Sequence, residues 1–261
     1  MILFIYIIAV GSLFIFLIIF MVVASHHDTV TEEVITHPHI SKAFDDFTIF
    51  FIADVHRRKV KHRTIEKIDT NVDAVFIGGD LIERGVSLDK MRDNIRTLQQ
   101  LQAPIYFVWG NNDYEVSPKK MYHILQSEGV IVLEDTIDMI RRKEEHLNII
   151  GFNYSFDHEL EPLVDWQCVD SSYTILLTHK PSSFFTLNDL EQAKIDLVLA
   201  GHTHGGQIRF FGFGLYEKGG FQTYNNTPIF VTEGYGYTML PFRLGTKSQC
   251  HLITLQHISN V

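Results

Sequence analysis

The sequence predicts an α/β fold, and three observations support that prediction. Five short apolar runs rich in β-branched residues are spaced along the chain, as in the buried strands of an α/β sheet. Segments with the apolar spacing of helices lie between some of them. Each run is followed by glycine or by polar side chains of the kinds that bind metal ions. Because ligands bind at the carboxyl edge of such sheets, we expect the functional site at that edge.

The chain begins with an apolar segment, Ile2–Ala24, that has no charged side chain. Twenty-three residues at about 1.5 Å each span roughly 35 Å, and the hydrocarbon core of a bilayer is about 30 Å thick. A secretory signal peptide is the alternative, because Val22–Ala24 resembles a cleavage site. However, the segment exceeds the roughly 7–15 residues of a signal peptide's apolar region, and no Lys or Arg precedes it. We therefore expect residues 1–24 to form an uncleaved, single-pass membrane anchor.

A polar segment, residues 25–43, follows the predicted anchor and contains Pro38, so we expect a tether. The folded domain is predicted to cover residues 44–261. The positive-inside rule counts Lys and Arg beside a membrane span, and few lie near this one. Acidic side chains precede the first Lys after the span, and we expect the domain on the extracytoplasmic side.

Within the domain, strands and helices are predicted to alternate. The predicted strands with polar ends are Phe47–Ile52, Ala74–Ile77, Ile105–Trp109, Ile175–Leu177 and Leu197–Ala200. The predicted helices are Asp89–Gln102, Pro118–Glu128 and Ser182–Gln192. Two later apolar runs, Ile229–Thr232 and Leu252–Leu255, predict further strands.

The amino-acid composition argues against some classes of protein. A net charge of −9 and an isoelectric point near 5.8 argue against a nucleic-acid-binding protein, which normally has a basic face. Cys168 and Cys250 provide no disulfide framework, and we expect both to be small buried side chains.

The polar residues after the five strands form the candidate site. They are Asp54 and His56, then Asp80, then Asn111, Asn112 and Asp113, then His179, and finally His202 and His204. Taken singly, these residues have explanations other than metal binding. Asp80 could be a turn residue, Asn111 could adopt a left-handed turn, and His179 could cap a following helix. A single His-x-His pair could be a coincidence on the surface. As a set, these alternatives require a coincidence at every strand. The pattern therefore predicts one cage of mixed oxygen and nitrogen ligands.

The ordered motifs Asp54-x-His56, Gly79-Asp80, Gly110-Asn111, Thr178-His179 and Gly201-His202-Thr203-His204 resemble the calcineurin-like metallophosphoesterase family. The continuation Gly205-Gly206-Gln207 and the segment Leu240-Pro241-Phe242-Arg243-Leu244-Gly245 are similar to its membrane-anchored branch. The resemblance implies a four-layer α/β/β/α sandwich with a dinuclear metal site at one edge.

The resemblance also implies a role for each ligand. Asp54, His56 and His204 would hold one divalent ion. Asn111, His179 and His202 would hold the second, and Asp80 would bridge both. Mixed imidazole, carboxylate and amide ligands suit Mn, Fe or Zn better than Mg.

The sequence departs from the family at one catalytic position. The usual third motif is Gly-Asn-His followed by an acid, whereas this chain has Gly110-Asn111-Asn112-Asp113. The missing histidine stabilises charge on the phosphate and protonates the leaving oxygen. Asn112 can donate a hydrogen bond but cannot supply a proton. Asp113 would have oriented that histidine, and here it can cap the turn. His146 and His158 are candidate replacements, although their spacing supports neither.

These features predict a membrane-anchored phosphoesterase that attacks a phosphoester or pyrophosphate bond with a metal-bound hydroxide. The expected substrate is a phosphorylated small molecule or lipid, and the lipid-linked version rests on analogy with relatives. A catalytically weak or silent metal-binding module for a phosphorylated ligand is the alternative, because of Asn112. A purely structural anchored domain is a third alternative.

Two further segments have open interpretations. The basic stretch Arg57–Arg63 is either a solvated surface or a site that attracts anionic groups. The aromatic residues Phe210, Phe211, Phe213, Tyr216 and Phe221 either pack a short sheet or form an apolar wall for lipid chains beside the membrane.

Overall fold

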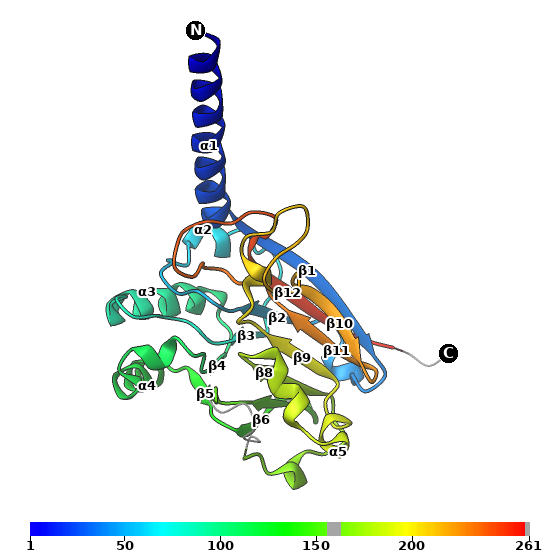
Figure 1. Cartoon of the computed structure of the whole chain (residues 1–261). Helices are drawn as coiled ribbons and strands as arrows, with labels where there is room; N and C mark the ends of the chain where they lie inside the picture. Colours follow the sequence, from blue (N-terminus) through cyan, green and yellow to red (C-terminus); the bar gives the residue numbers. More distant parts are fainter. Residues whose placement is uncertain (156–162, 259–261) are drawn as a thin grey trace.

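Two six-stranded mixed sheets face each other, with helical segments on their outer sides (Figure 1). The computed structural model describes residues 1–155 and 163–258. The first sheet has the order β1-β12-β2-β3-β4-β5, and the second has the order β10-β11-β9-β8-β7-β6. The predicted four-layer α/β/β/α sandwich is therefore confirmed.

The first sheet comprises β1 (Asp28–His37), β2 (Phe47–Ile52), β3 (Ala74–Ile77), β4 (Ile105–Val108), β5 (Ile131–Leu133) and β12 (Ser248–His257). The second comprises β6 (Thr136–Arg142), β7 (Glu145–Gly151), β8 (Thr174–Thr178), β9 (Leu197–Ala200), β10 (Gly220–Tyr224) and β11 (Thr227–Val231). The strands predicted from the late apolar runs correspond to β11 and β12, and both are longer at their amino-terminal ends than predicted.

The core is divided into layers by the alternation of side chains along each strand. In β2, Phe47, Ile49 and Phe51 belong to the cluster between the two sheets, while Phe50 and Ile52 face the outer helices. Because both faces of the central strands are buried, these strands are apolar throughout. This burial fixes the strand positions and therefore the positions of the residues at their ends.

Helices α3 (Leu88–Leu98) and α4 (Pro118–Ser127) cover the outer face of the first sheet. Ser87 caps α3 by accepting a hydrogen bond from the backbone of Lys90. The helix predicted to reach Gln102 is α-helical only to Leu98 and continues as a 3₁₀ turn, η2 (Gln99–Leu101).

The outer layer of the second sheet is thinner than predicted. The predicted helix Ser182–Gln192 is instead a 3₁₀ segment, η5 (Pro181–Thr186), followed by the short α5 (Asp189–Gln192). Asn188 separates them, because its side chain forms a capping box with Glu191 that begins a new helix.

The two cysteines differ in exposure. Cys250 is buried as predicted, but Cys168 in η4 (Trp166–Cys168) is exposed, so the prediction that Cys168 is buried was wrong.

The carboxyl ends of the central strands meet at one edge of the sandwich. Parallel pairing aligns Ile52 of β2 with Ile77 of β3, and Ile77 with Phe107 of β4. In the second sheet, parallel pairing aligns Thr178 of β8 with Ala200 of β9. The loops that follow these strands are therefore neighbours.

The prediction that residues 25–43 form a tether is wrong for the central part of this segment, because Asp28–His37 form the strand β1. This strand pairs in parallel with β12 along its whole length, from Asp28 with Ser248 to His37 with His257. An edge strand such as β12 would otherwise present unpaired backbone groups, and β1 satisfies them. Its mostly polar side chains remain partly exposed, so composition alone resembles that of a linker.

The apolar helix α1 (Ile2–His26) projects from one end of the sandwich (Figure 1). By length and hydropathy it is a candidate membrane span. Its last turn is attached to the domain, where Met21 and Ser25 are buried. The Ser25 hydroxyl donates to the carbonyl of Pro241 (2.8 Å), and the backbone N–H of Arg243 donates to the carbonyl of Met21 (3.1 Å).

A buried carboxylate, Asp28, ties the start of β1 to the domain. It accepts hydrogen bonds from Arg58, Lys61 (3.1 Å), Thr64 (2.7 Å) and Tyr235 (2.9 Å). Burial acts to raise the pKa of Asp28, but the bonds from Thr64 and Arg58 outweigh burial and lower this pKa to about 2. The ionised carboxylate therefore stabilises the folded state.

We predict that Asp28→Asn lowers the free energy of unfolding by roughly 3 kcal/mol, because it leaves the buried Arg58 without its charge partner. The wild-type advantage should be complete above about pH 5 and mostly lost by pH 2, because Asp28 is then protonated in the unfolded state and about half protonated in the folded state. Urea unfolding of the full chain in detergent, followed between pH 2 and 6, measures this. A constant difference across that range would contradict the assignment.

Candidate metal centre

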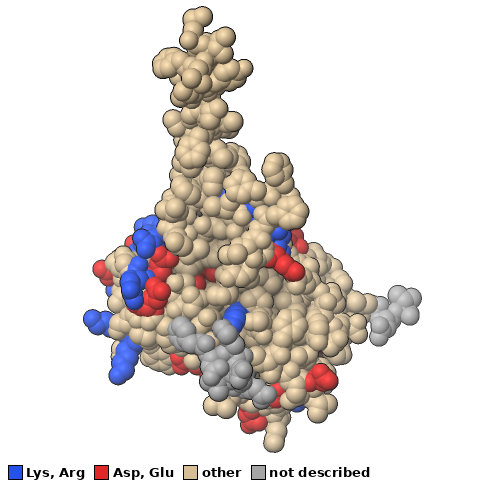
Figure 2. Space-filling model, in the orientation of Figure 1, with Lys and Arg blue, Asp and Glu red and all other residues tan. Residues whose placement is uncertain are grey.

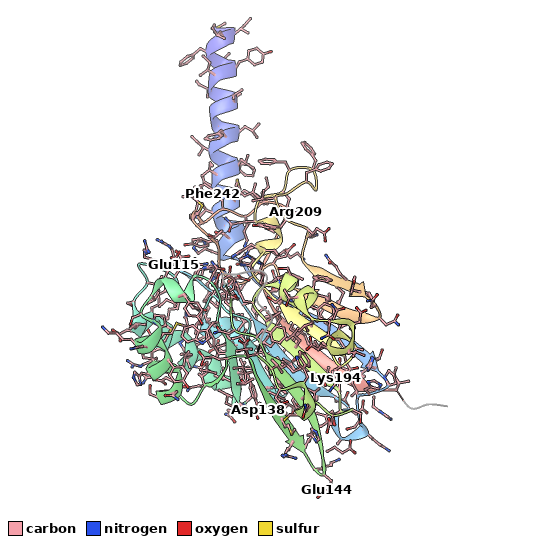
Figure 3. All side chains as sticks on the ribbon, turned by 60° about the horizontal axis from the view of Figure 1, so that its bottom comes forward. Glu115, Asp138, Glu144, Lys194, Arg209 and Phe242 are labelled. Atoms are coloured by element: carbon pink, nitrogen blue, oxygen red, sulfur yellow. The ribbon has the colours of Figure 1, made fainter. Side chains whose placement is uncertain are left out.

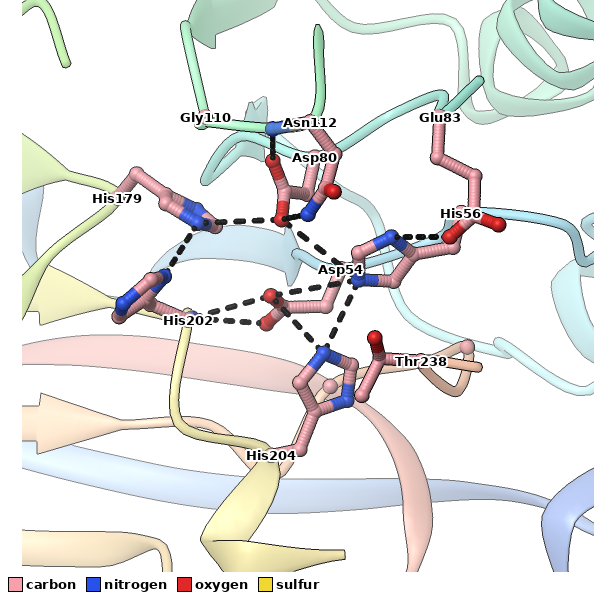
Figure 4. A network of polar contacts seen from close by, with 12 residues as sticks. Asp54, His56, Asp80, Glu83, Gly110, Asn112, His179, His202, His204 and Thr238 are labelled. Atoms are coloured by element: carbon pink, nitrogen blue, oxygen red, sulfur yellow. Dashed lines mark hydrogen bonds and ion pairs between the residues drawn. The ribbon is translucent and has the colours of Figure 1, made fainter. Parts of the chain in front are cut away.

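All seven predicted ligands come together where the two sheets meet at their carboxyl edges, and Figure 4 labels all of them except Asn111. Asp54 and His56 follow β2, Asp80 follows β3 and Asn111 follows β4. His179 follows β8, and His202 and His204 follow β9.

One group consists of Asp54, His56 and His204. The Nε2 atoms of His56 and His204 lie 3.0 Å apart. Oδ1 of Asp54 lies 3.5 Å from Nε2 of His204 and 3.9 Å from Nε2 of His56. All three side chains are buried. This is the set predicted for the first ion.

A second group lies on the other side of Asp80. Nε2 of His179 lies 3.3 Å from Oδ2 of Asp80 and 3.2 Å from Oδ1 of Asn111. Nδ1 of His202 lies 3.1 Å from the same His179 nitrogen. These side chains correspond to the set predicted for the second ion.

Two carboxylates reach both groups. Oδ2 of Asp80 lies 3.6 Å from Nε2 of His56 and 3.3 Å from Nε2 of His179, so it occupies the position expected of a bridge. Asp54, predicted to serve one ion, also lies with Asp80 and His179 in a second possible ligand group. The two groups are therefore one continuous cage.

The backbone at the ligands is conformationally unusual. Five of the seven have positive φ angles: Asp54, His56, Asp80, His202 and His204. Left-handed backbone is uncommon outside glycine and is concentrated at functional sites, where the surrounding structure supports its cost. The sharp turns direct successive side chains of each loop toward the same centre.

Close packing of the loops against predicted ligands explains two of the glycines. A Cβ on Gly110 would lie 2.2 Å from Oδ1 of Asp80, so any side chain there would displace the carboxylate. Similarly, a Cβ on Gly201 would lie 2.6 Å from Oδ2 of Asp54. Both glycines are required by close approach to a predicted ligand.

Supporting contacts orient the imidazoles. Nδ1 of His179 lies 2.9 Å from the carbonyl of Gly78, and donation to that carbonyl leaves Nε2 as the free ligand atom. Nδ1 of His56 lies 3.1 Å from a carboxylate oxygen of Glu83, which has the same effect. Glu83 was not predicted from the sequence; the only signal is its position three residues after Asp80.

Arg243 was also missed, although its segment contributes to the family resemblance. Its guanidinium is fully buried and donates to the carbonyls of Glu233, Gly234 (3.0 Å) and Gly236 (2.7 Å). It also lies 3.4 Å from Nδ1 of His204. Arg243 thus holds the loop that closes the cage.

Burial and charge affect the histidines differently. Burial lowers the pKa of His202 to about 4 and that of His204 well below its usual range, which keeps both rings neutral and able to bind a metal. Burial also acts to lower the pKa of His179, but the charge of Asp80 outweighs it and raises this pKa to about 9. Burial raises the pKa of Asp54 to about 6. A cation beside these carboxylates would stabilise their ionised forms.

The two residues at the position of the family's missing histidine have distinct environments. Asn112 is partly exposed, and it donates to Oδ1 of Asp80 from its backbone (2.8 Å) and to Oδ2 from its side chain (2.6 Å). Asp113 is buried and accepts from the backbone N–H groups of Asp80, Gly110 and Ile82. Asp113 therefore joins two ligand loops, which is more than capping its own turn.

Of the two candidate replacement histidines, only His146 can be placed, and it lies away from the cage. His146 begins β7, at the opposite end from its carboxyl edge, and contacts Asp170 at 2.9 Å. His158 lies outside the residues that the structure describes.

The spacing and donor types fit divalent ions. Ligand atoms about 2.1 Å from one ion lie about 3.0–3.5 Å from each other in tetrahedral or octahedral geometry. The 3.0 Å contact between Nε2 of His56 and Nε2 of His204 can be shared by a proton or a cation. The combination of imidazole, carboxylate and amide donors suits Mn, Fe or Zn.

The cage opens into a cavity of about 260 Å³. Its lining includes five of the seven predicted ligands, namely His56, Asp80, Asn111, His202 and His204, and also Asn112. Gln207, Leu215 and Thr238 from two later loops complete it.

Comparisons with known proteins agree with this geometry. The profile of the calcineurin-like phosphoesterase family matches residues 47–206, which is more than half of the chain. The chain is 39% identical over 212 residues to the uncharacterized protein YpbG of Bacillus subtilis (strain 168), covering 80% of each chain.

Two other relatives are more distant. The phosphodiesterase YaeI of Escherichia coli (strain K12) is 25% identical over 228 residues, covering 80% of this chain and 82% of its own. A transmembrane protein with metallophosphoesterase domain from Danio rerio is 27% identical over 243 residues, covering 83% of this chain and 55% of its own.

The fold, the order of the polar motifs along the strands and the family match lead to one conclusion. This chain belongs to the calcineurin-like phosphoesterase family.

Proposed function

We propose that the protein is a membrane-anchored phosphoesterase with a dinuclear metal site, acting on a phosphoester or pyrophosphate bond. One observation carries the proposal: side chains from five strand ends bring their oxygen and nitrogen atoms within 3.0–3.9 Å of one another in a buried cage. A purely structural domain has no need of so many buried polar groups, which are costly unless they are paired or bind a cation.

The residues divide into two ligand sets with a shared bridge. Asp54, His56 and His204 would hold one ion, and Asn111, His179 and His202 the other, with Asp80 between them. Two ions at such a site supply an activated water and stabilise charge on the phosphoryl oxygens. Asn112 would donate a hydrogen bond to a phosphoryl oxygen, while Asp113 and Glu83 keep the ligand loops and the His56 ring in position.

The substrate class follows from the missing proton donor and from the anchor. Because Asn112 cannot protonate a leaving oxygen, substrates with good leaving groups, such as phosphoanhydrides and activated esters, suit this site. A site held close to a bilayer suits a lipid-linked phosphate. The domain is proposed to lie on the extracytoplasmic side.

The burial of Met21 and Ser25 against the domain supports an uncleaved anchor, since removal of α1 would expose their packing partners.

A binding module without turnover is the second candidate. Asn112 favours it, because general acid catalysis typically contributes about 10²–10⁴-fold. Metal content measured together with hydrolysis of bis(p-nitrophenyl) phosphate separates the two candidates. Two bound ions without metal-dependent turnover would favour the binding module.

We predict that Asp80→Asn removes both tight metal binding and hydrolysis, because it weakens the proposed bridge between the ions. The loss of metal affinity should exceed the roughly 10–100-fold effect typical of residues that only support a ligand. Metal analysis of the full chain in detergent, with Mn²⁺ titration, measures it. Asp89→Asn is the matched control, since that carboxylate is exposed on α3. Unchanged metal content in Asp80→Asn would refute the dinuclear assignment.

We predict that Asn112→His raises turnover of aryl phosphodiesters with poor leaving groups more than of those with good ones, by up to about 10²-fold. The reason is that an imidazole at this position can donate the proton that the leaving oxygen requires. Hydrolysis rates are measured for a series of aryl phosphodiesters whose leaving groups are substituted phenols of different pKa.

Asn112→Gln is the control for Asn112→His, because it keeps the amide donor and adds no titratable group. Equal or lower rates for the histidine variant across the series would contradict the proposed gap in proton donation.

A further inference from the structure

Exposed apolar side chains of the domain are concentrated in two loops beside α1. The first loop, residues 208–216, carries Phe210, Phe211, Phe213 and Leu215, and the second, residues 237–242, carries Met239 and Leu240. Phe211 is fully exposed, and Phe213, Leu215 and Met239 are more than four-fifths exposed. We call these six residues the apolar collar. The alternative that the aromatic residues pack a sheet is therefore wrong for Phe210, Phe211 and Phe213.

The collar lies at the end of the domain from which α1 projects. In Figures 1 and 3 the loop that follows η6 (His204–Gly206) rises beside the lower part of α1, and Arg209 and Phe242 lie near the helix base. Figure 2 shows uncharged side chains over α1 and over the projecting loop, with most Lys, Arg, Asp and Glu lower on the body.

Internal hydrogen bonds order the first loop. The Arg209 guanidinium donates to the carbonyls of Gly205 (2.9 Å), Gly212 (2.6 Å) and Tyr216 (2.5 Å). The backbone groups of Phe210 and Phe213 also bond to each other across the turn. The exposed rings are thus presented by a defined loop, and contiguous exposed apolar surface of this kind marks an interaction site.

A chain of hydrogen bonds fixes the collar relative to α1. The Gln207 side chain bonds to Thr238 and Leu240, which joins the two loops. Pro241 and Arg243 in turn bond to Ser25 and Met21 of the helix. The direction of α1 therefore determines where the collar lies relative to a bilayer.

The length of α1 determines how close the domain lies to the membrane. Only Ile2–Phe16 is continuously exposed, and fifteen residues rise about 22 Å, which is less than the roughly 30 Å hydrocarbon core. Residues from Leu17 to about Met21, where the helix begins to be covered by the domain, are needed to complete the span. The apolar loops at the helix base then reach the membrane boundary.

We propose that the apolar collar inserts into the same bilayer that α1 spans, so that the domain rests on the lipid surface. This inference rests on the proposed membrane anchor. Leu215 lines the cavity of the metal cage and belongs to the collar, and Thr238 borders both. The mouth of the cavity therefore lies beside the lipid surface, and a lipid-linked phosphate could reach the predicted ligands while its lipid chain stays in the bilayer.

The basic stretch fits this placement. Arg57–Arg63 and the helix end at His26 line a cavity of about 650 Å³ that also includes Tyr237, next to the collar. Arg58 and Lys61 pair with Asp28, and Arg57 pairs with Glu83. The aromatic ring of Tyr237 at this level matches the aromatic belt that is typical of the membrane interface.

The experiment places an environment-sensitive NBD probe at single cysteines in the full chain, reconstituted into phosphatidylcholine vesicles. The background is Cys168→Ser, because Cys168 is exposed and Cys250 is buried. Phe211→Cys reports on the collar and Val10→Cys on α1. Leu190→Cys is the matched control, since Leu190 is equally apolar and exposed but lies on α5.

We expect NBD emission at positions 211 and 10 to shift to the blue and to lose most of its intensity when spin-labelled lipid is added, while position 190 remains unaffected. A quenched position 10 with a water-exposed position 211 would overturn the collar and leave the anchor intact. If position 10 is also water-exposed, both proposals fail. Quenching at position 190 equal to that at 211 would overturn the collar, because contact with lipid would not be specific to it.

Discussion

The placement of Asp80 between two imidazole groups is the constraint on which the rest of the site depends. Its carboxylate lies 3.6 Å from His56 of the first sheet and 3.3 Å from His179 of the second, so it can serve both groups only if the two sheets end at the same level. That requirement is met by the register of the buried parallel strands. Burial of both sheet faces therefore supports the cage, since a shift of one residue would turn the ligands away from it.

Local backbone strain and close packing are concentrated where the chemistry is expected. The left-handed turns at five predicted ligands cost free energy individually, and the cage of hydrogen bonds around them compensates for this cost. Gly110 leaves room for the Asp80 carboxylate, and Asp113 holds the two adjoining loops through three backbone N–H groups. The same loop presents Asn112 to the cavity. The loops that hold the predicted ligands are therefore ordered around Asn112, where the family resemblance predicted a histidine.

The direct attachment of α1 to the domain connects the candidate membrane span with the site. With β1 in the sheet and Met21 and Ser25 packed against the loop that contains Arg243, little of the chain is free to act as a flexible linker. Arg243 also organises the backbone beside His204. The helix, the apolar collar and the candidate metal cage are thus parts of one continuous hydrogen-bonded structure, as the proposed action at a bilayer surface requires.

The sequence by itself determined the fold class, the apolar helix and the side chains at the strand ends, because short buried strands and their polar ends are local patterns. It did not reveal Glu83 or Arg243, whose roles depend on contacts with residues distant in the chain. It also misjudged residues 25–43, because an edge strand with mostly exposed polar side chains has the composition of a linker. Only the tertiary structure decided that this segment pairs with β12, that Asp54 joins both ligand groups, and that the aromatic loop is exposed beside α1. Strand pairing, shared ligands and exposure are relations between distant segments, so they become defined only when the chain is folded.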